Sequence, residues 1–320
     1  MNIFHHITVL AEELVAGLCL RPGDCVIDCT AGGGGHTALM LAAVGSSGKV
    51  IAIDRDSAAI ARLQERFGAE LAAGTLQLHQ GVFSDLEALV RGLGLVGKIR
   101  GIGADFGVSS PQLEQSERGF SLQQDGPLDM RMSMNGADST AAELLAEASQ
   151  EELADLFFHL GEEPKGRYFA RKIVEARVDQ PFTSTKQLAD FIVKCSPYKG
   201  HSRKHPATKI FQALRIKVND ELGEISRLLT QAFEVLAPGG RLSMISFHSL
   251  EDRLVKHFFQ DKAGKRPPLL PHLRDLPLLV LPGQEVYGRI IRPFPLIPRE
   301  QEVHKNPRAR SAKLRVLEKV

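Results

Sequence analysis

The sequence of 320 residues lacks several features that would each indicate a particular class of protein. Its four cysteines form no CxxC pair and have no zinc-ligand spacing, and we predict no metal site. The N-terminal residues include no basic segment followed by a long apolar stretch. No apolar run approaches the roughly 20 residues that a membrane helix needs. We therefore expect a cytoplasmic protein with reduced thiols and no membrane partner.

Net charge is also small, a formal +2 at pH 7, but the charges are unevenly distributed. Residues 133–164 contain eight acids and no Lys or Arg, whereas residues 199–217 contain six Lys and Arg and no acid. This segregation indicates one face built for a polyanion. The apolar fraction of 43% and the charged fraction of 24% are ordinary for a globular protein.

The apolar pattern predicts an α/β fold with a doubly wound, mostly parallel sheet. We expect strands over residues 25–28, 49–54, 76–79, 99–105 and 240–247. The helices expected between the early strands cover residues 10–18, 36–44 and 58–67. Alternation near the C-terminal residues 306–315 indicates a last strand.

The pattern changes after Pro111, where only helical segments are recognisable, over residues 141–160, 168–178 and 185–194. We therefore predict a helical domain at 113–206 that is inserted into a discontinuous α/β domain of 1–112 and 207–320. The proline-rich segment 265–298 is expected to be extended and irregular.

A glycine loop follows the first predicted strand. Asp28 ends that strand, Gly32–Gly35 are four consecutive glycines, and His36 opens the next helix. Glycines permit close approach of a ligand, and a helix N-terminus directs free N–H groups toward it. The spacing from Gly33 to Ala38 also satisfies the loose dinucleotide pattern. The loop alone therefore fits a dinucleotide, S-adenosylmethionine or a purely structural turn.

Two acids favour S-adenosylmethionine. Asp28 lies where a carboxylate could hold the ammonium group of a methionine moiety, and where it would repel a pyrophosphate. Asp54 ends the second strand and is placed to accept hydrogen bonds from ribose hydroxyls, unless it only caps the strand. A cationic sulfonium ligand suits this acidic loop better than NAD does, so the loop favours methyl transfer.

Longer motifs extend through nearly the whole chain. They are His6–Leu10, Gly34–His36, Ala52–Asp56, Asp105–Gln112, Glu117–Ser121, Asp125–Met132, His205–Thr208, Ser246–Arg253 and Asn306–Ser311. With these motifs the sequence resembles the RsmH (MraW) family of bacterial methyltransferases. That family acts on the N4 amine of a cytidine in the decoding region of 16S rRNA.

The resemblance implies a class I, Rossmann-like methyltransferase that uses S-adenosylmethionine, with a helical domain for substrate recognition. Its expected partner is 16S rRNA within the 30S subunit. It implies cofactor contacts from Gly34, Gly35, His36, Asp54, Phe83, Asp105 and Gln112; the loop argument adds Asp28 and Gly32.

Asp105 begins the loop after the fourth predicted strand, where amino-methyltransferases usually carry an acid-Pro-Pro-aromatic motif. Here the acid and a Ser-Pro pair are present, without the closing aromatic. We expect Ser109, Ser110 and Pro111 to meet the target base, with Asp105 near both the cofactor and the amine. The alternatives for Asp105 are a contact with the cofactor alone and a structural cap.

The target base must be splayed out and held by stacking. Phe106, Phe120 and Phe247 are candidates, although each could instead be a buried core residue. We expect His248 and Ser249 to line the same cleft. Arg131 is expected either to order its loop or to reach the substrate.

Basic residues are expected to neutralise phosphates and to make binding salt-dependent. The candidates for RNA contacts are Lys204, His205, Lys209, Arg215, Arg308 and Arg310. A solvated basic face would explain the same charges.

Three other functions are compatible with parts of the pattern. A DNA cytosine-N4 methyltransferase would share the chemistry, and only the family motifs distinguish it. A nucleotide-binding oxidoreductase is disfavoured by Asp28 and by the lack of an obvious hydride-transfer pair. A non-catalytic ribosome assembly factor would keep the fold without turnover. The helical insertion and the proline-rich segment are candidate surfaces for a homodimer.

Overall fold

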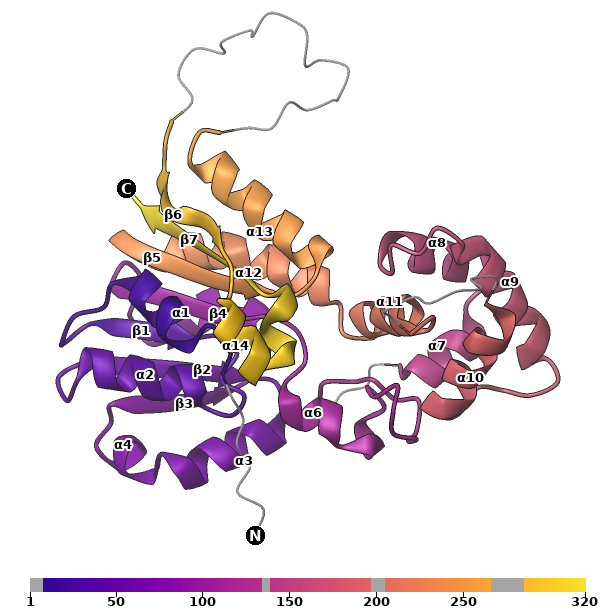
Figure 1. The fold of residues 1–320 in the computed structure, drawn as a ribbon. Coiled ribbons are helices and arrows are strands. Elements are labelled where there is room, and N and C mark those ends of the chain that lie inside the picture. The colour runs from indigo at the N-terminus through magenta and orange to yellow at the C-terminus, as the bar shows by residue number, and fades with distance from the viewer. Residues whose placement is uncertain (1–7, 134–138, 197–204, 266–284) are drawn as a thin grey trace, which may run out of the picture. The chain divides into compact units, whose positions relative to one another are not determined.

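The computed structural model describes residues 8–133, 139–196, 205–265 and 285–320, and the chain forms two compact units (Figure 1). The first unit comprises Met1–Gly107 and Leu222–Val320. The second comprises Val108–Glu221. Within the described ranges, no helix is long and apolar enough to cross a membrane.

The first unit is built on a seven-stranded sheet in the order β3-β2-β1-β4-β5-β7-β6. The strands are β1 (Cys25–Asp28), β2 (Lys49–Asp54), β3 (Leu76–Gln80), β4 (Ile99–Asp105), β5 (Leu236–Ser246), β6 (Gly288–Leu296) and β7 (Lys313–Lys319). Strands β1 to β5 are parallel, whereas β7 runs antiparallel to both β5 and β6. Because β1 lies between β2 and β4, the strand order reverses there, which is where open α/β sheets bind ligands. The predicted α/β fold is confirmed.

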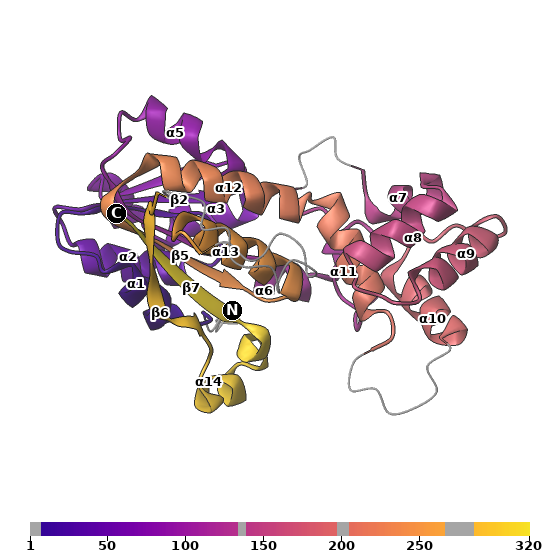
Figure 2. The same cartoon turned by 90° about the horizontal axis from the view of Figure 1, so that it is seen from above.

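Helices cover both faces of this sheet (Figure 2). They are α1 (Ala11–Leu18), α2 (Gly35–Val44), α3 (Ser57–Arg66), α4 (Gly68–Ala72), α5 (Leu86–Gly92), α12 (Glu221–Val235), α13 (Ser249–Lys262) and α14 (Glu300–Lys305). Neighbouring strand residues point to opposite layers: Val26 packs with residues of α1, α2 and α3, and Ile27 with residues of α5, α12 and α13. The near-continuous apolar runs of β1 and β2 follow from this burial on both faces.

The second unit is helical. Its elements are α6 (Ser110–Glu114), α7 (Ala141–Glu147), α8 (Gln150–His159), α9 (Gly166–Arg177), α10 (Thr185–Cys195) and α11 (Thr208–Val218). Its own apolar core includes the buried Phe157 and Phe169. The unit boundaries differ from the expected domain boundaries at 112 and 206. In particular α11 belongs to the helical unit, because Ile210 and Leu214 pack in that core.

Two secondary-structure predictions were wrong. The single helix expected over 141–160 is two helices, because Ser149 and Glu152 form a capping box that starts α8: Ser149 N donates to Glu152 Oε2 at 2.8 Å. The irregular segment expected over 265–298 contains β6, although residues 266–284 lie outside the described ranges. Strand β6 accommodates Pro293 and Pro295 because it is an edge strand with a register shift after Ile291.

Candidate functional site

Three carboxylates stand at the carboxyl ends of adjacent parallel strands. Asp28 ends β1, Asp54 ends β2 and Asp105 ends β4. Strands β2 and β4 flank β1, so the three residues share one edge of the sheet. This edge is the candidate active site.

Asp28 holds the glycine loop from within. It is 1% exposed, and its Oδ1 accepts a hydrogen bond from Thr30 N at 3.2 Å while its Oδ2 accepts one from Thr37 Oγ1 at 2.6 Å. Burial raises the pKa of Asp28, although the hydrogen bonds from Thr37 and Thr30 oppose this rise. Both oxygens are therefore used inside the loop, which connects β1 to α2.

Glycine is required at Gly34 of the loop. Gly34 has φ +77°, a left-handed conformation, and a Cβ there would stand 2.6 Å from Phe67 Cε2 and 2.7 Å from Leu63 Cδ2. Arg66 Nη1 also donates to the carbonyl oxygen of Gly33 at 2.5 Å. Helix α3 thus packs closely against the loop, which only a residue without a side chain permits.

His36 faces away from solvent and fixes the N-terminal segment. Its side chain is buried, and its Nε2 lies 3.2 Å from the carbonyl oxygen of Val9. Burial lowers the pKa of His36 to about 4, so the ring is neutral at pH 7 and Nε2–H is the donor. Its imidazole Nε2 therefore anchors the segment before α1, and its backbone lies at the start of α2.

Asp54, at the end of β2, stabilises the glycine loop through a hydrogen bond. Its Oδ2 accepts a hydrogen bond from Gly32 N at 2.8 Å, and its Oδ1 accepts one from Asp56 N at 2.9 Å. Burial raises the pKa of Asp54 to about 6 despite these bonds, and the charges of Asp56 and Asp28 raise it further. Each oxygen keeps a second lone pair that could accept a ribose hydroxyl.

Asp105 has an oxygen that is both buried and unused. Its backbone N–H donates to Thr30 Oγ1 at 2.6 Å, which joins the loop after β4 to the glycine loop. Among the described residues, its Oδ1 has no hydrogen-bond partner although it is buried. Burial raises the pKa of Asp105 well above its usual value, and the charges of Asp28 and Glu251 add to the rise.

The electrostatics of this edge follow from these contacts. Each charge that shifts the pKa of Asp54 or Asp105 is another carboxylate and raises it. A ligand that carries positive charge would relieve this repulsion, whereas a pyrophosphate would add to it. These carboxylates therefore fit a ligand with a cationic sulfonium and disfavour a dinucleotide.

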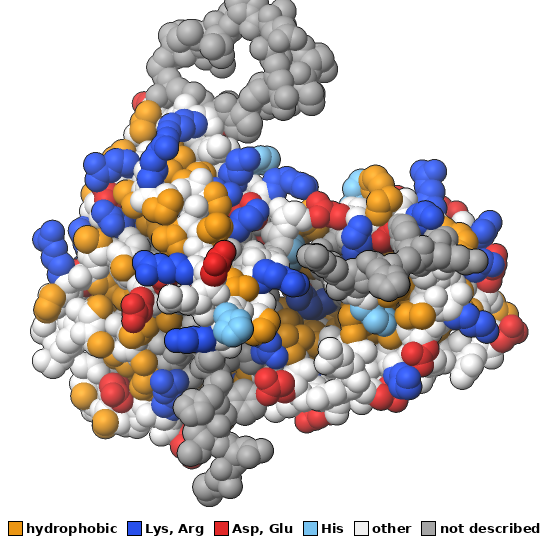
Figure 3. Space-filling model, in the orientation of Figure 1, with side chains coloured by type: hydrophobic (Ala, Val, Ile, Leu, Met, Phe, Trp, Pro, Cys, Tyr) orange, Lys and Arg blue, Asp and Glu red, His pale blue; other side chains and the backbone are white. Residues whose placement is uncertain are grey.

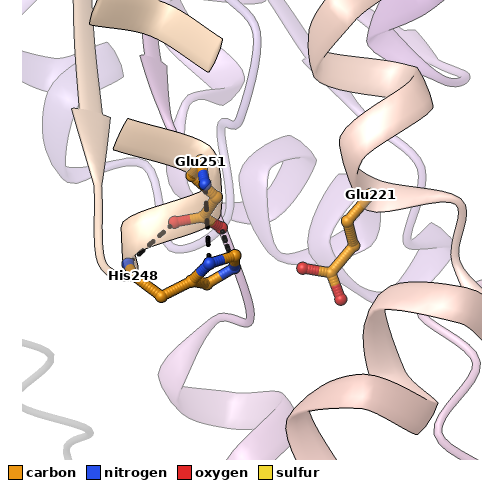
Figure 4. A group of neighbouring side chains, drawn as sticks. All are labelled: Glu221, His248 and Glu251. Carbon is orange, nitrogen blue, oxygen red and sulfur yellow. Dashed lines mark hydrogen bonds and ion pairs between the residues drawn. The ribbon is translucent and has the colours of Figure 1, made fainter. Parts of the chain in front are cut away.

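A fourth carboxylate, which the sequence analysis did not single out, follows β5. Glu251 is fully buried, and its Oε2 accepts hydrogen bonds from Phe247 N at 2.8 Å and His248 N at 3.2 Å. Figure 4 shows the His248 ring beside this carboxylate, with Nε2 3.1 Å from Oε1. A glutamate three residues after an N-cap residue is the capping-box spacing, which was the available signal.

The phenylalanines differ in their burial. Phe106 is 2% exposed and lies in the core of the first unit, where its ring centroid is 6.1 Å from that of Phe83. Phe120 is 7% exposed and lies in the core of the helical unit. Phe247 is half-buried beside the β5 end. Of the three stacking candidates, only Phe247 offers a substantial exposed surface.

Several expected site residues belong to the helical unit. Ser109 precedes α6, and its backbone N–H donates to Gln112 Oε1 at 3.0 Å, so Gln112 serves as a cap. Pro111 lies in the first turn, where its missing N–H costs nothing. Ser110 is the first residue of α6.

Arg131 also lies in the helical unit. It forms a bidentate ion pair with Asp129, with distances of 2.9 and 2.8 Å, so it orders its own loop.

The candidate RNA contacts fall into two groups. Arg308 and Arg310 are exposed on the 3-10 turn Pro307–Ser311, next to α14. Figure 3 shows Lys and Arg side chains on the face of the first unit that carries α14.

The second group lies in the helical unit. There His205 is exposed, whereas Lys209 Nζ donates to the Glu162 carbonyl oxygen at 2.7 Å. Arg215 pairs with Glu221 through two hydrogen bonds of 2.7 and 2.8 Å. Lys204 lies outside the described residues.

Comparison with known proteins identifies the family of this chain. Residues 3–320 match the model of the MraW methylase family. A ribosomal RNA small subunit methyltransferase H from Magnetococcus marinus is 45% identical over 317 residues, which cover 99% of each chain.

Solved structures of methyltransferases also align with the chain. A methyltransferase homologue from Pyrococcus horikoshii has a TM-score of 0.44 at 12% identity, covering 98% of this chain and 68% of its own. A SAM-dependent methyltransferase from Aquifex aeolicus has a TM-score of 0.41 at 10% identity, covering 98% and 90%.

Proposed function

Because the chain belongs to the MraW methylase family, we propose that it methylates the N4 amine of cytidine 1402 in the decoding region of 16S rRNA. The enzyme is a methyltransferase that depends on S-adenosylmethionine. We further propose that its substrate is the assembled 30S subunit in the cytoplasm, because an internal rRNA base is recognised mainly by the shape around it.

The residues at the carboxyl edge of the sheet fit this cofactor. When bound, S-adenosylmethionine supplies a methyl group on a positively charged sulfur. Asp54 would accept the ribose hydroxyls, and the Gly32–Gly35 loop with the start of α2 would offer close backbone contact. Phe83 and Gln112 remain proposed contacts of the adenosine end. Asp28 supports the loop through Thr30 and Thr37.

The unused oxygen of Asp105 is the single observation that carries the proposal. A buried carboxylate oxygen without a partner costs free energy, so a site that keeps one is expected to pair it with a ligand. We assign Asp105 Oδ1 to accept a hydrogen bond from the target amine. This bond favours the pyramidal form of the amine, in which its lone pair is no longer delocalised into the cytosine ring. The main task of Ser109–Pro111 at the start of α6 is then to position the base.

The exposed Arg308 and Arg310 are proposed to contact phosphates, together with His205, Lys204 and Lys209. The tight pair with Glu221 supports a structural role for Arg215 instead. We also propose Phe247 as the stacking residue, on the basis of its exposed surface. A homodimer stays a prediction that light scattering can test.

Methyl transfer from labelled S-adenosylmethionine tests this function directly. We expect label in N4-methylcytidine when 30S subunits that lack the modification are the acceptor, and much less label with naked 16S rRNA. Label in DNA cytosine, or in another nucleoside, would contradict the substrate. Equal rates on naked rRNA and on subunits would contradict the requirement for the assembled particle.

A further inference from the structure

Glu251 occupies a place between the ends of two strands. It lies in the first turn of α13, directly after β5, and is fully buried. One carboxylate oxygen receives the N–H groups of Phe247 and His248, and the other lies 3.1 Å from His248 Nε2 (Figure 4). The first oxygen thus fixes the Phe247–His248 turn, and the second lies beside the His248 ring.

The loop after β4 passes close to the same carboxylate. Gly107, two residues after Asp105, has φ +96°, a conformation that favours glycine. A Cβ at Gly107 would stand 3.9 Å from both Glu251 Oε1 and Phe247 Cδ2, which is ordinary van der Waals contact, so this backbone passes about one side-chain atom away from the pair. Phe106 N also donates to the Ile245 carbonyl oxygen at 3.0 Å, which joins the two strand ends.

The neighbouring acid has a different environment. Asp252 faces β7, where it pairs with Arg315 at 2.8 Å and with Lys313 at 3.0 Å. The two consecutive acids on α13 therefore have different roles. Asp252 ties the helix to the sheet, whereas Glu251 accepts hydrogen bonds from the turn that carries Phe247 and lies near the turn that follows Asp105.

We propose that Glu251 is a positioning residue of the methyl-transfer site, which locks the turn after β5 against the turn after β4 so that Asp105 and Phe247 keep a fixed separation. This inference rests on the proposed function. Its charge also acts on Asp105: the titratable groups that face Asp105 are Asp28 from β1 and Glu251 from α13, and both disfavour its ionised form. Among the described residues of the first unit, His248 is a titratable group beside Glu251 itself.

The test compares Glu251→Gln with Asp252→Asn in the full chain. Glutamine keeps a carbonyl oxygen for the N–H groups of Phe247 and His248, so the fold is expected to persist. With 30S subunits we expect kcat to fall about 10- to 100-fold in Glu251→Gln, since small misplacements at a reacting centre cost that much. The Kd for S-adenosylmethionine, from calorimetry, should change less than about threefold because the cofactor carboxylates are untouched. In Asp252→Asn the melting temperature should fall while kcat, measured well below that temperature, stays as in the wild type.

A second readout does not depend on activity. In protein with ¹³C-labelled aspartate carboxyl groups, the Asp105 signal is identified by its absence in Asp105→Asn. Its titration midpoint should move to lower pH in Glu251→Gln, because one neighbouring negative charge is lost, and should not move in Asp252→Asn. An unchanged midpoint, or a kcat in Glu251→Gln equal to that of the wild type, would overturn the inference. If the wild type fails to methylate 30S subunits, the proposed function fails, and the carboxyl titration still decides on Glu251.

Discussion

The hydrogen bond of 2.6 Å from Asp105 N to Thr30 Oγ1 joins the two loops that meet at the centre of the sheet edge. Thr30 belongs to the glycine loop after β1, and Asp105 carries the unused carboxylate oxygen at the end of β4. This hydroxyl group therefore adds a direct link between the proposed cofactor loop and the proposed acceptor of the amine, beyond the pairing of β1 with β4.

Replacing Thr30 by valine should impair both catalysis and stability. The change removes the hydroxyl at nearly constant volume and leaves the Asp105 N–H without an acceptor, at a cost of about 1–3 kcal/mol. We expect kcat to fall about tenfold, since each 1.4 kcal/mol is a factor of ten. Thr30→Ser, which restores the hydroxyl, should recover most of the rate. Equal rates for Thr30→Val and the wild type in a single-turnover assay would show that this bond does not position Asp105.

Binding of S-adenosylmethionine should strengthen as pH rises toward neutrality. Burial raises the pKa of Asp54 to about 6, and a carboxylate that accepts ribose hydroxyls near a cation is favoured in its ionised form. Below pH 6 binding must first remove a proton, so affinity should fall by up to about tenfold per pH unit and level off above pH 7. His36 does not contribute in this window, because its pKa of about 4 leaves it neutral.

Calorimetry of Asp54→Asn provides the control for this pH dependence. The variant should bind S-adenosylmethionine about 10- to 100-fold more weakly at pH 8, as expected for the loss of hydrogen bonds to a charged group. Its affinity should vary less with pH between 5 and 7 than that of the wild type. A pH dependence identical to that of the wild type would assign the proton to another group.

The ion pairs of Asp252 should matter for stability. Arg315 is 5% exposed in its side chain and Asp252 is 11% exposed, so removing the arginine leaves a largely buried carboxylate with only Lys313. We expect Arg315→Met to lower the free energy of unfolding by about 2–4 kcal/mol, as for a broken buried pair. Arg289→Met is the matched control on β6: its side chain is 64% exposed, so its pair with Glu318 should contribute less than about 1 kcal/mol. Urea unfolding of both variants measures the difference, and equal losses would contradict it.

The exposed tail arginines and the less exposed Arg215 should affect RNA binding differently. Each of Arg308→Gln and Arg310→Gln should reduce the slope of log affinity against log salt by about one, because each removes one phosphate contact. The melting temperature should not change. Arg215→Gln should instead lower the melting temperature, because Glu221 loses its partner. Filter binding at several salt concentrations separates the two groups; a salt slope unchanged in both tail variants would remove the tail from the interface.

The parallel core of the sheet could be predicted from the sequence, because burial on both faces leaves a clear mark. Strands β1 and β2 were placed correctly since residues such as Val26 and Ile27 are both apolar and serve opposite layers. Strand β6 was missed because Pro293 and Pro295 argue against a central strand, and only the assembled sheet shows that it is an edge. The break between α7 and α8 carried a sequence signal, the Ser149–Glu152 capping box, that helical periodicity obscured.

Residue types at the site could be predicted better than their partners. The acids at the strand ends were found because parallel strands deliver their carboxyl ends to one edge. The sequence could not show that His36 bonds Val9, or that Arg215 is engaged by Glu221, since these contacts depend on packing. Glu251 was overlooked as a site residue because it approaches the edge from a helix that follows a distant strand.

Single-turnover methyl transfer by Asp105→Asn tests the central claim most directly. Asp24→Asn is the control, because Asp24 precedes β1 at the opposite edge of the sheet, where it accepts a hydrogen bond from Arg21 N. With 30S subunits and saturating S-adenosylmethionine, the loss of a charged acceptor of the target amine should slow N4-methylcytidine formation about 10- to 200-fold. Folding and cofactor affinity should be kept, and Asp24→Asn should match the wild type. A rate for Asp105→Asn within about twofold of the wild type would contradict the role assigned to this carboxylate.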